Sequence, residues 1–299
     1  MIPNEFYLVL DRAKAEYQKN IPLAPRSSFR IGGSSEVGVF PKSTEELSLC
    51  LSAARRYGLK YHVIGKGSNL LFGDRLIEGV FIFTERLDKA EINGEYVDAE
   101  AGASLASLSA MAANASLSGL EFARGIPASV GGAVFMNAGA YGGQMSDIVA
   151  YTTALDTESG EIIQLTEHSF SYRESIYMKN SALVCLSARL CLDHGDKAEI
   201  GEKMREYTAK RREKQPLEFP SAGSYFKRPE GYFAGKLIED CGLKGLCVGG
   251  AAVSEKHAGF LINLGSATAA DVLELEKRVI DTVYEKFGVT LEREVRVIT

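Results

Sequence analysis

Residues 125–143 read Gly-Ile-Pro-Ala-Ser-Val-Gly-Gly-Ala-Val-Phe-Met-Asn-Ala-Gly-Ala-Tyr-Gly-Gly, without a single charged side chain. A shorter glycine turn, Gly-Lys-Gly-Ser-Asn at residues 65–69, follows residues 61–64, which are typical of a strand. Glycine loops of this kind let backbone N–H groups approach a pyrophosphate without interference from side chains. One such loop alone is usually a plain turn, but two in one region favour a site for a large nucleotide cofactor. Neither matches a named phosphate motif, since residues 65–69 lack the third glycine of the dinucleotide fingerprint.

The composition is that of a soluble globular protein: 299 residues, 45% hydrophobic and 24% charged. This length suggests two domains, and the net charge of −5 excludes a globally basic surface for nucleic acid. Five cysteines without a CxxC pair and four histidines at no ligand spacing predict a reducing compartment, free thiols and no metal site. The N-terminus shows no export signal, and residues 125–146 are too rich in glycine for a transmembrane helix. We therefore expect a cytoplasmic protein without membrane insertion.

The hydrophobic periodicity predicts an α+β fold, in which strands group with separate helices. Helices are expected near the N-terminus and at 43–58, 104–115, 198–215, 233–240 and from Thr268 to Gly288. Strands are expected at 61–64, 79–84, 95–99, 181–192, 259–263 and 291–298, with a hairpin formed by 150–155 and 161–165. Cys185 and Cys191, six residues apart, should then share one face of their strand. The charged helix from residue 198 is the predicted boundary between a region 1–197, divided again near 75–80, and a region 198–299.

Three polar residues in these elements have simple structural interpretations when taken one at a time. Arg173 is most simply a surface ion-pair residue, and Ser224 a turn residue outside any Gly-x-Ser-x-Gly elbow. Glu294 alternates with Glu292 and Arg296 on what is normally a solvated strand face. Residue spacing alone therefore indicates several backbone-rich loops and no assigned reaction.

Six motifs add information through their order along the chain. They are Phe29-Arg30-Ile31-Gly32-Gly33, Gly67-Ser68-Asn69-Leu70-Leu71, residues 125–142, Tyr172-Arg173-x-Ser175, residues 223–229 (Gly-Ser-Tyr-Phe-Lys-Arg-Pro) and residues 291–295 (Leu-Glu-Arg-Glu-Val). Together they resemble the UDP-N-acetylenolpyruvoylglucosamine reductase family, FAD enzymes of bacterial peptidoglycan synthesis. The resemblance implies an FAD-binding domain of the vanillyl-alcohol-oxidase type at 1–197, followed by a smaller α+β substrate-binding domain at 198–299.

The resemblance also implies a reaction and its cofactors. The family uses non-covalent FAD and NADPH to reduce UDP-N-acetylglucosamine enolpyruvate to UDP-N-acetylmuramate. Hydride addition to the enolpyruvyl group pushes charge into its carboxylate; at matching motif positions, Arg173 and Glu294 would stabilise that charge. Glu294 would do so only if protonated or if it orients a donor, and Ser224 would supply the proton to C2. The implied cofactor-binding residues are Gly65, Lys66, Gly67, Ser68, Asn69, Gly125, Ile126, Ser129, Gly131, Gly132, Asn137, Ala138 and Gly139.

Two features depart from the family pattern. Ala128 stands where the family has glycine, and the stretch between Arg173 and Ser224 lacks an insertion that carries a substrate-covering tyrosine in one subtype. The chain therefore resembles the loop-lacking subtype, in which Tyr141 is a candidate cover for the nucleotide. Candidate partners for the substrate diphosphate, with plain solvated positions as the alternative, are Arg212, Lys214 and Arg228.

Two other functions are compatible with the same residues. An FAD oxidase of the same cofactor fold would be reoxidised by air without an enolpyruvyl substrate. A non-catalytic protein that binds a nucleotide sugar or a flavin would take up a UDP-sugar without consuming NADPH. The small-molecule partners differ between these readings, but none of them involves nucleic acid or a membrane.

Overall fold

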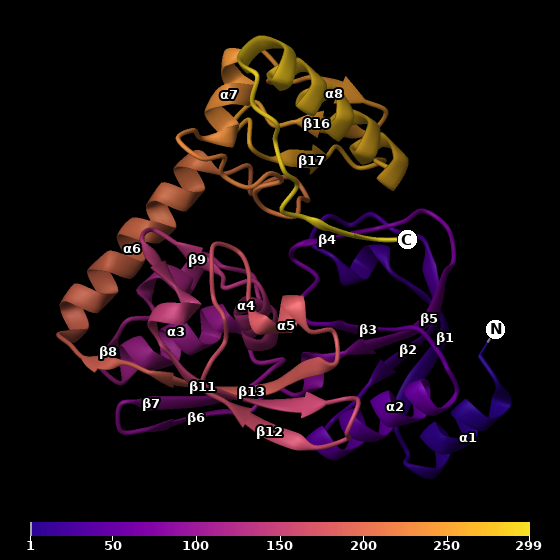
Figure 1. The fold of residues 1–299 in the computed structure, drawn as a ribbon. Coiled ribbons are helices and arrows are strands. Elements are labelled where there is room, and N and C mark those ends of the chain that lie inside the picture. Colours follow the sequence, from indigo (N-terminus) through magenta and orange to yellow (C-terminus); the bar gives the residue numbers. More distant parts are fainter. Residues whose placement is uncertain (1) are drawn as a thin grey trace. The chain divides into compact units, whose positions relative to one another are not determined.

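The computed structural model describes residues 2–299. Its chain divides into two compact units (Figure 1). The first contains the residues up to Lys19 together with Glu36–Lys66 and Glu78–Lys210, and the second contains Asn20–Ser35, Gly67–Ile77 and Arg211–Thr299. The units are thus interleaved along the chain, whereas the predicted division after residue 197 is a simple succession. Strand pairing explains the interleaving, because β4 (Leu70–Phe72) runs parallel to β18 (Arg296–Ile298).

In the first unit, the N-terminal part is a four-stranded sheet covered by two helices. The strand order is β1-β2-β5-β3, with β3 and β5 parallel. Helix α2 begins after Ser43, whose hydroxyl caps it by accepting a hydrogen bond from the Glu46 N–H at 3.3 Å, so the helix predicted at 43–58 is confirmed. The bounds are α1 Asn4–Arg12, β1 Glu16–Pro22, β2 Ser34–Phe40, α2 Thr44–Arg56, β3 Tyr61–Ile64 and β5 Ile77–Phe83.

The same unit contains a five-stranded sheet of order β12-β11-β13-β7-β6. Helices α3, α4 and α5 lie on one face of it, and Val97, Leu105, Val130 and Leu190 share the core between them (Figure 1). The predicted hairpin is confirmed by the antiparallel pair β11–β12. The bounds are β6 Ala90–Asn93, β7 Tyr96–Glu100, α3 Leu105–Asn114, β8 Leu117–Ser118, α4 Val130–Phe135, β9 Gly139–Ala140, β10 Gly143–Gln144, β11 Val149–Asp156, β12 Ile162–Leu165, α5 Ile176–Lys179, β13 Leu183–Cys191, β14 Asp193–His194 and α6 Lys197–Lys214.

A β-bulge in β13 overturns one prediction about the cysteines. Ala154 pairs with Cys185 and Thr153 pairs with Ser187, so one residue of β13 is skipped. The bulge reverses the alternation of side chains, and as a result Cys185 is buried whereas Cys191 is exposed. The two thiols therefore do not share a face of the strand.

The second unit combines a small antiparallel sheet with two helices. Its sheet order is β15-β16-β17, and helix α8 packs its buried stripe of Val272, Leu275, Val279 and Val283 into the same core. A capping box between Thr268 and Asp271 begins α8, and Gly288, with a φ of 66°, ends it. The bounds are α7 Ala234–Asp240, β15 Cys247–Val248, β16 Ala251–Val253, β17 Leu261–Asn263 and α8 Ala269–Phe287.

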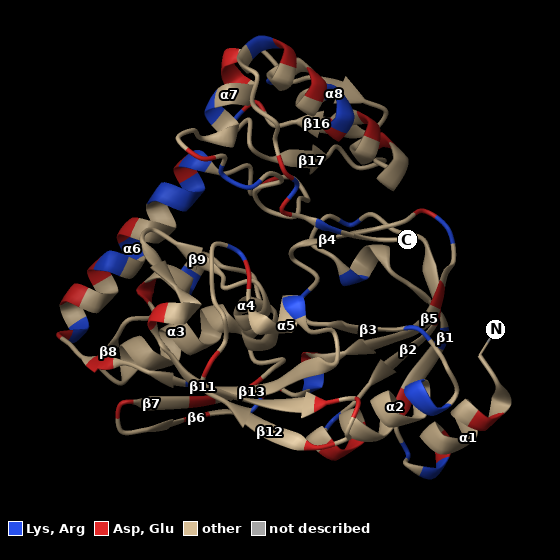
Figure 2. Ribbon diagram, in the orientation of Figure 1, with Lys and Arg blue, Asp and Glu red and all other residues tan. Residues whose placement is uncertain are grey.

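Charged residues are distributed as on an ordinary solvated surface. Figure 2 shows acidic and basic residues interspersed along α6 and α8. Within residues 2–299, none of the helices is long and apolar enough to cross a bilayer. Nor do the described His, Cys, Asp and Glu residues form a group of three or more that could hold a metal ion.

Candidate functional site

The glycine loop at residues 125–132 is tied to the rest of the first unit by its own N–H groups. The N–H of Val130 donates to the Ala103 carbonyl at 2.9 Å, and that of Gly131 to the Ala101 carbonyl at 2.8 Å. The Gly132 N–H donates to the Ser129 hydroxyl at 3.3 Å. The expectation of a run of free N–H groups is therefore wrong for these three residues, because the first turn of α4 uses them to fix the loop.

What the loop does offer is bare backbone beside the second glycine turn. Gly132 is exposed, and a Cβ added there would meet only the Ser129 hydroxyl, at 3.2 Å. A Cβ added at Gly65 would overlap the same hydroxyl, so the Gly65 turn and the Ser129 loop lie against each other. Gly131 is also closely packed, since its Cβ would lie 2.9 Å from that of Ala101. Gly65 and Gly131 are thus needed for packing, whereas Gly132 leaves an open approach for a ligand.

Asn137 fixes the segment that follows α4. Its side-chain amide donates to the Ser171 carbonyl at 3.0 Å and contacts the Gln144 side chain at 3.4 Å. Its side-chain oxygen accepts from the Ser146 N–H at 2.9 Å. The residue is almost fully buried, so these contacts satisfy the side chain within the protein. The structure thus gives Asn137 a supporting position rather than an open one.

The next residues form a tight hairpin, β9–β10, next to the Arg173 side chain. Gly139 pairs with Gln144, and its carbonyl accepts a hydrogen bond from Arg173 Nη2 at 3.1 Å. Ala138 accepts from the Met145 N–H at 3.0 Å. Tyr141 lies at the exposed tip, and its ring stacks on Tyr207 of α6 with centroids 4.5 Å apart and planes 8° apart.

The second unit brings together three of the predicted motifs. Asn69 donates through its side-chain amide to the Glu294 carbonyl at 3.1 Å. The Glu294 N–H donates to the Tyr225 carbonyl at 2.8 Å, which places Ser224 and Glu294 on adjacent antiparallel segments. Ser224 is exposed, and no hydrogen bond to a described residue engages its hydroxyl. Gly67, with a φ of 62°, packs directly on the Arg26 and Ser27 backbone, where a Cβ would overlap.

Comparisons with known proteins agree with these motifs. Residues 35–166 match a family described as FAD binding domain, and residues 215–298 match UDP-N-acetylenolpyruvoylglucosamine reductase, C-terminal domain. The UDP-N-acetylenolpyruvoylglucosamine reductase of Caldicellulosiruptor bescii is 46% identical over 98% of this chain and 94% of its own length. That of Lachnoclostridium phytofermentans is 49% identical over 93% of this chain and 92% of its own. The chain belongs to the UDP-N-acetylenolpyruvoylglucosamine reductase family.

A solved structure supports the same assignment. The crystal structure of UDP-N-acetylenolpyruvylglucosamine reductase from Thermus caldophilus has a TM-score of 0.81 and is 36% identical, covering 95% of this chain and 99% of its own. The predicted fold, an FAD-binding domain of the vanillyl-alcohol-oxidase type with a smaller α+β domain, is confirmed. The prediction that the chain is an FAD-dependent oxidoreductase is also confirmed. The roles of the individual residues are predictions still.

The first unit contains most of residues 35–166, which match an FAD binding domain, and has exposed backbone that fits this cofactor. Gly132 leaves backbone exposed next to the Ser129 hydroxyl, and a side chain there would fill that space, whereas Gly65 packs directly on the same hydroxyl. Ala128, the departure from the family pattern, is accommodated because its methyl group packs against the core of the unit and its carbonyl accepts from the Leu105 N–H at 3.0 Å. Of the remaining predicted residues, Lys66 is exposed, whereas Gly125 and Ile126 are half-buried at the end of a 3-10 turn.

The basic candidates of the second unit differ in how they are held. Arg212 and Lys214 are exposed on the last turn of α6, and the Arg212 carbonyl accepts from Lys256 Nζ at 2.7 Å. Arg228 lies over the Phe233 ring, with its guanidinium carbon 4.4 Å from the centroid. Such a cation–π contact restrains the position of the guanidinium.

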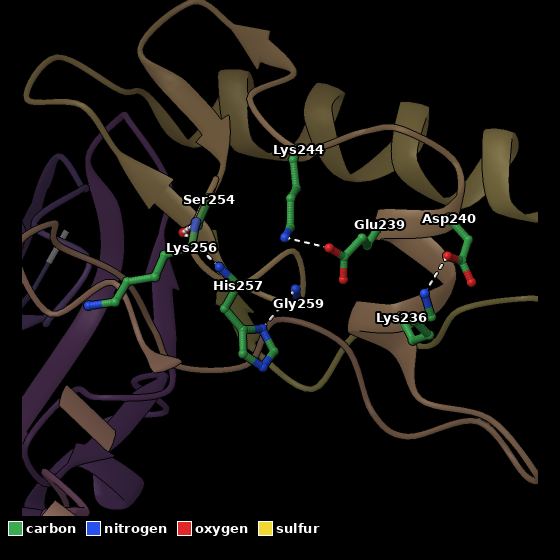
Figure 3. Close-up of polar contacts among 8 residues, drawn as sticks. All are labelled: Lys236, Glu239, Asp240, Lys244, Ser254, Lys256, His257 and Gly259. Carbon is green, nitrogen blue, oxygen red and sulfur yellow. Dashed lines mark hydrogen bonds and ion pairs between the residues drawn. The ribbon is translucent and has the colours of Figure 1, made fainter. Parts of the chain in front are cut away.

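Nearby lysines are neutralised by acidic neighbours. Figure 3 shows Lys236 directed at Asp240 and Lys244 at Glu239, each at 2.6 Å. In the same view, His257 accepts the Gly259 N–H at Nδ1 at 3.1 Å, and burial lowers the pKa of His257. The ring is thus neutral at neutral pH and carries its proton on Nε2.

Sequence reasoning missed several residues that support the predicted ones. The Tyr207 ring stacks on that of Tyr141. The buried side chains of Thr152, His168 and Tyr177 are hydrogen-bonded to one another at the base of residues 168–176, which contain Arg173. These contacts join residues that are distant in sequence or lie on different elements, so no spacing rule could have indicated them.

Proposed function

We propose that this chain catalyses the NADPH-dependent reduction of UDP-N-acetylglucosamine enolpyruvate to UDP-N-acetylmuramate, a step in the synthesis of peptidoglycan precursors. The observation that carries the proposal is the similarity of nearly the whole chain, both domains included, to reductases of this name. Bound FAD supplies the two-electron carrier between NADPH and the enolpyruvyl group. We assign the remaining tasks to the side chains of the protein.

In this proposal Arg173 stabilises the negative charge that develops on the substrate carboxylate. Its hydrogen bond to the Gly139 carbonyl, at 3.1 Å, orients the guanidinium, a group that binds a carboxylate through parallel N–H donors. Because Arg stays protonated at any physiological pH, its charge needs no proton transfer to act.

Ser224 and Glu294 act on the same substrate in different ways. The exposed Ser224 hydroxyl donates the proton that C2 requires after hydride has arrived. Glu294, half-buried on the neighbouring segment, orients a donor or acts in its protonated form. The backbone hydrogen bond from Glu294 to Tyr225 brings the segments of Ser224 and Glu294 together, which supports a joint role.

We propose that the predicted glycine positions hold FAD non-covalently. Gly132 offers exposed backbone to the cofactor, and the close packing of Gly65 on the Ser129 hydroxyl holds the Gly65 turn beside the loop. Tyr141 covers the substrate nucleotide. The cations that meet its diphosphate are Arg212, Lys214 and Arg228. We further propose that the protein acts in the cytoplasm and contributes through cell-wall synthesis to cell shape and division.

The experiment that tests the function follows both half-reactions on the purified flavoprotein. Anaerobic stopped-flow absorbance should show flavin reduction by NADPH and rapid reoxidation by the enolpyruvyl substrate, with one UDP-N-acetylmuramate formed per NADPH by mass spectrometry. Rapid reoxidation by air alone would instead indicate an oxidase. Binding of the substrate without any change in flavin absorbance would indicate a non-catalytic binding protein.

A further inference from the structure

A buried polar network lies beneath the segment that carries Arg173, within the first unit. We propose that Thr152, His168 and Tyr177 are positioning residues that hold the Arg173 guanidinium in its reactive orientation. This inference rests on the role proposed above for Arg173 and adds three buried residues that would act through it.

The backbone at Arg173 adopts a conformation that needs outside support. Its φ is 59°, in the left-handed region, which is strained for a residue with a Cβ. Ser171 and Glu174 bracket it, each N–H donating to the other's carbonyl at 3.2 Å. Conformations of this kind persist where the surrounding structure fixes them from several sides.

One side of the segment is fixed by the last residue of α4 and by a residue shortly after this helix. Asn137 donates to the Ser171 carbonyl at 3.0 Å, and the fully buried Ser175 hydroxyl donates to the Phe135 carbonyl at 2.8 Å. Arg173 itself donates to the Gly139 carbonyl at 3.1 Å. These contacts place the guanidinium beside the β9–β10 hairpin but leave the base of the segment to be held by other residues.

The base is held by the Thr152 hydroxyl of β11. It lies 2.9 Å from His168 Nε2 and 2.5 Å from the Tyr177 hydroxyl, so that one buried atom joins both ends of the segment. All three side chains are nearly or fully buried. The Ile176 N–H also donates to the His168 carbonyl at 2.6 Å, which closes residues 168–176 into a loop.

The direction of the hydrogen bonds follows from their chemistry. The His168 ring also bonds to the Thr166 backbone, and burial lowers the pKa of His168, so the imidazole is neutral at neutral pH. With the proton on Nδ1 for the Thr166 carbonyl, Nε2 accepts from Thr152. The single Thr152 proton is then used, so Thr152 accepts from Tyr177, whose pKa burial raises. The hydrogen bonds that Thr152 makes to His168 and Tyr177 thus each have one direction, which favours a single loop position.

A fixed loop matters because a guanidinium recognises a carboxylate through two parallel hydrogen bonds. A displacement of about 1 Å at a reacting group can slow a reaction by roughly 10²-fold. Loss of one network hydroxyl should therefore slow the step that uses Arg173 and spare the step that does not.

Tyr177→Phe tests this with the removal of one oxygen atom. We expect reoxidation of the reduced flavoprotein by the enolpyruvyl substrate to slow by at least about tenfold, the lower part of that range. FAD content and reduction by NADPH should stay within about twofold of the wild type, since Arg173 acts on the enolpyruvyl group alone. Amide hydrogen exchange measured by mass spectrometry should accelerate in residues 168–176, a readout that does not depend on activity.

Tyr61→Phe is the matched control. The Tyr61 hydroxyl also bonds to a threonine, Thr157, at 3.1 Å, but it lies away from the Arg173 segment. Its loss should alter neither the reoxidation rate nor the exchange of residues 168–176. Thr152→Val should reproduce Tyr177→Phe, and Thr152→Ser, which keeps the hydroxyl, should restore the rate and so separate positioning from a general loss of packing.

Arg173→Ala distinguishes failure of this inference from failure of the proposed function. Normal reoxidation in Arg173→Ala would remove Arg173 from the mechanism, and the positioning role with it. Slow reoxidation in Arg173→Ala, with Tyr177→Phe and Thr152→Val both behaving like Tyr61→Phe, would overturn the positioning role alone. If the network acts through Arg173, adding Tyr177→Phe to Arg173→Ala should slow the reaction no further; fully multiplicative effects would overturn the inference.

Discussion

The adjacent glycines at the start of α4 should respond oppositely to the same substitution. In Gly131→Val the new Cβ lies 2.9 Å from the Ala101 Cβ and 3.2 Å from the Ala101 carbonyl oxygen. Ala101 cannot retreat without loss of its 2.8 Å hydrogen bond from the Gly131 N–H, so the overpacking should cost about 1–3 kcal/mol. In Gly132→Val the only near contact is the Ser129 hydroxyl at 3.2 Å. Since replacing a helical glycine gains a few tenths of a kcal/mol, roughly, folding should be nearly unchanged.

Cofactor binding should show the reverse order. If FAD approaches the bare backbone of Gly132, the valine side chain should weaken FAD binding by at least about tenfold, equivalent to ~1.4 kcal/mol. Thermal unfolding of the FAD-free proteins and titration with FAD, followed by flavin fluorescence, measure the two effects separately. Each kcal/mol corresponds to roughly 2–4 °C in Tm.

The combination of results decides between packing and cofactor contact. Gly132→Val with wild-type FAD affinity would refute the assignment of Gly132 to the cofactor site. An equal fall of Tm in both variants would refute the packing argument, because the distances place the obstruction at Gly131 alone.

Three further outcomes concern the proton donor, the substrate cover and pH. Ser224→Ala should keep flavin reduction by NADPH and slow reoxidation by the enolpyruvyl substrate at least ~10²-fold in stopped flow; reoxidation at the wild-type rate would remove Ser224 from the mechanism. Tyr141→Leu and Tyr207→Leu should each lower the free energy of unfolding, measured by denaturant titration, by about 0.5–1.5 kcal/mol, because the ring stacking is lost. Only Tyr141→Leu should raise the KM for the nucleotide substrate. Equal KM values in the two variants would contradict the covering role. Burial depresses the pKa of His168, whose ring bonds to Thr152 and to the Thr166 backbone near the Glu167 carboxylate. The unfolded chain therefore takes up the proton first as pH falls below about 6.5, and folding stability is lost on acidification. The difference in unfolding free energy between the wild type and His168→Gln should narrow between about pH 7.5 and 5.5; a difference independent of pH would contradict the argument.

Local signals in the sequence predicted the helices well. The Ser43 cap, the start of α8 after Thr268 and its end at Gly288 all depend on residues within one or two turns of the helix. Their positions are set by backbone groups that the same segment must satisfy, so the pattern is legible in the sequence. The β11–β12 hairpin is local in the same sense, since its turn joins the two strands directly.

Long-range pairing was not predictable in this way. Strands β1 and β2 carried no distinct signal, because their partners are set by the sheet and not by their own alternation. The bulge that separates Cys185 from Cys191 depends on the partner strand β11. The last strand, β18, is also shorter than expected: it spans Arg296–Ile298, which pair with β4, whereas Arg293 forms an isolated bridge with Phe226.

The same difference between local sequence signals and long-range contacts applies to the residues of the candidate site. Arg173, Ser224 and Glu294 were found by the resemblance of their motifs, because spacing alone gave each a structural interpretation. The N–H groups of Val130, Gly131 and Gly132 were misjudged, since the sequence does not show that Ala101, Ala103 and Ser129 accept from them. Glycine-rich sequence reveals where backbone is bare but not whether its hydrogen bonds are already used.

The second unit shows why motifs far apart in sequence occur together in this family. Asn69 donates to the Glu294 carbonyl at 3.1 Å and accepts from the Arg296 N–H at 3.0 Å. The Glu294 N–H in turn donates to the Tyr225 carbonyl at 2.8 Å, beside Ser224. The Glu294 backbone is thus held on one side by the predicted cofactor turn and on the other by the segment of the predicted proton donor. A substitution at Asn69 should therefore alter the position of Glu294 as well as any contact with FAD, so the three motifs constrain one another through the backbone.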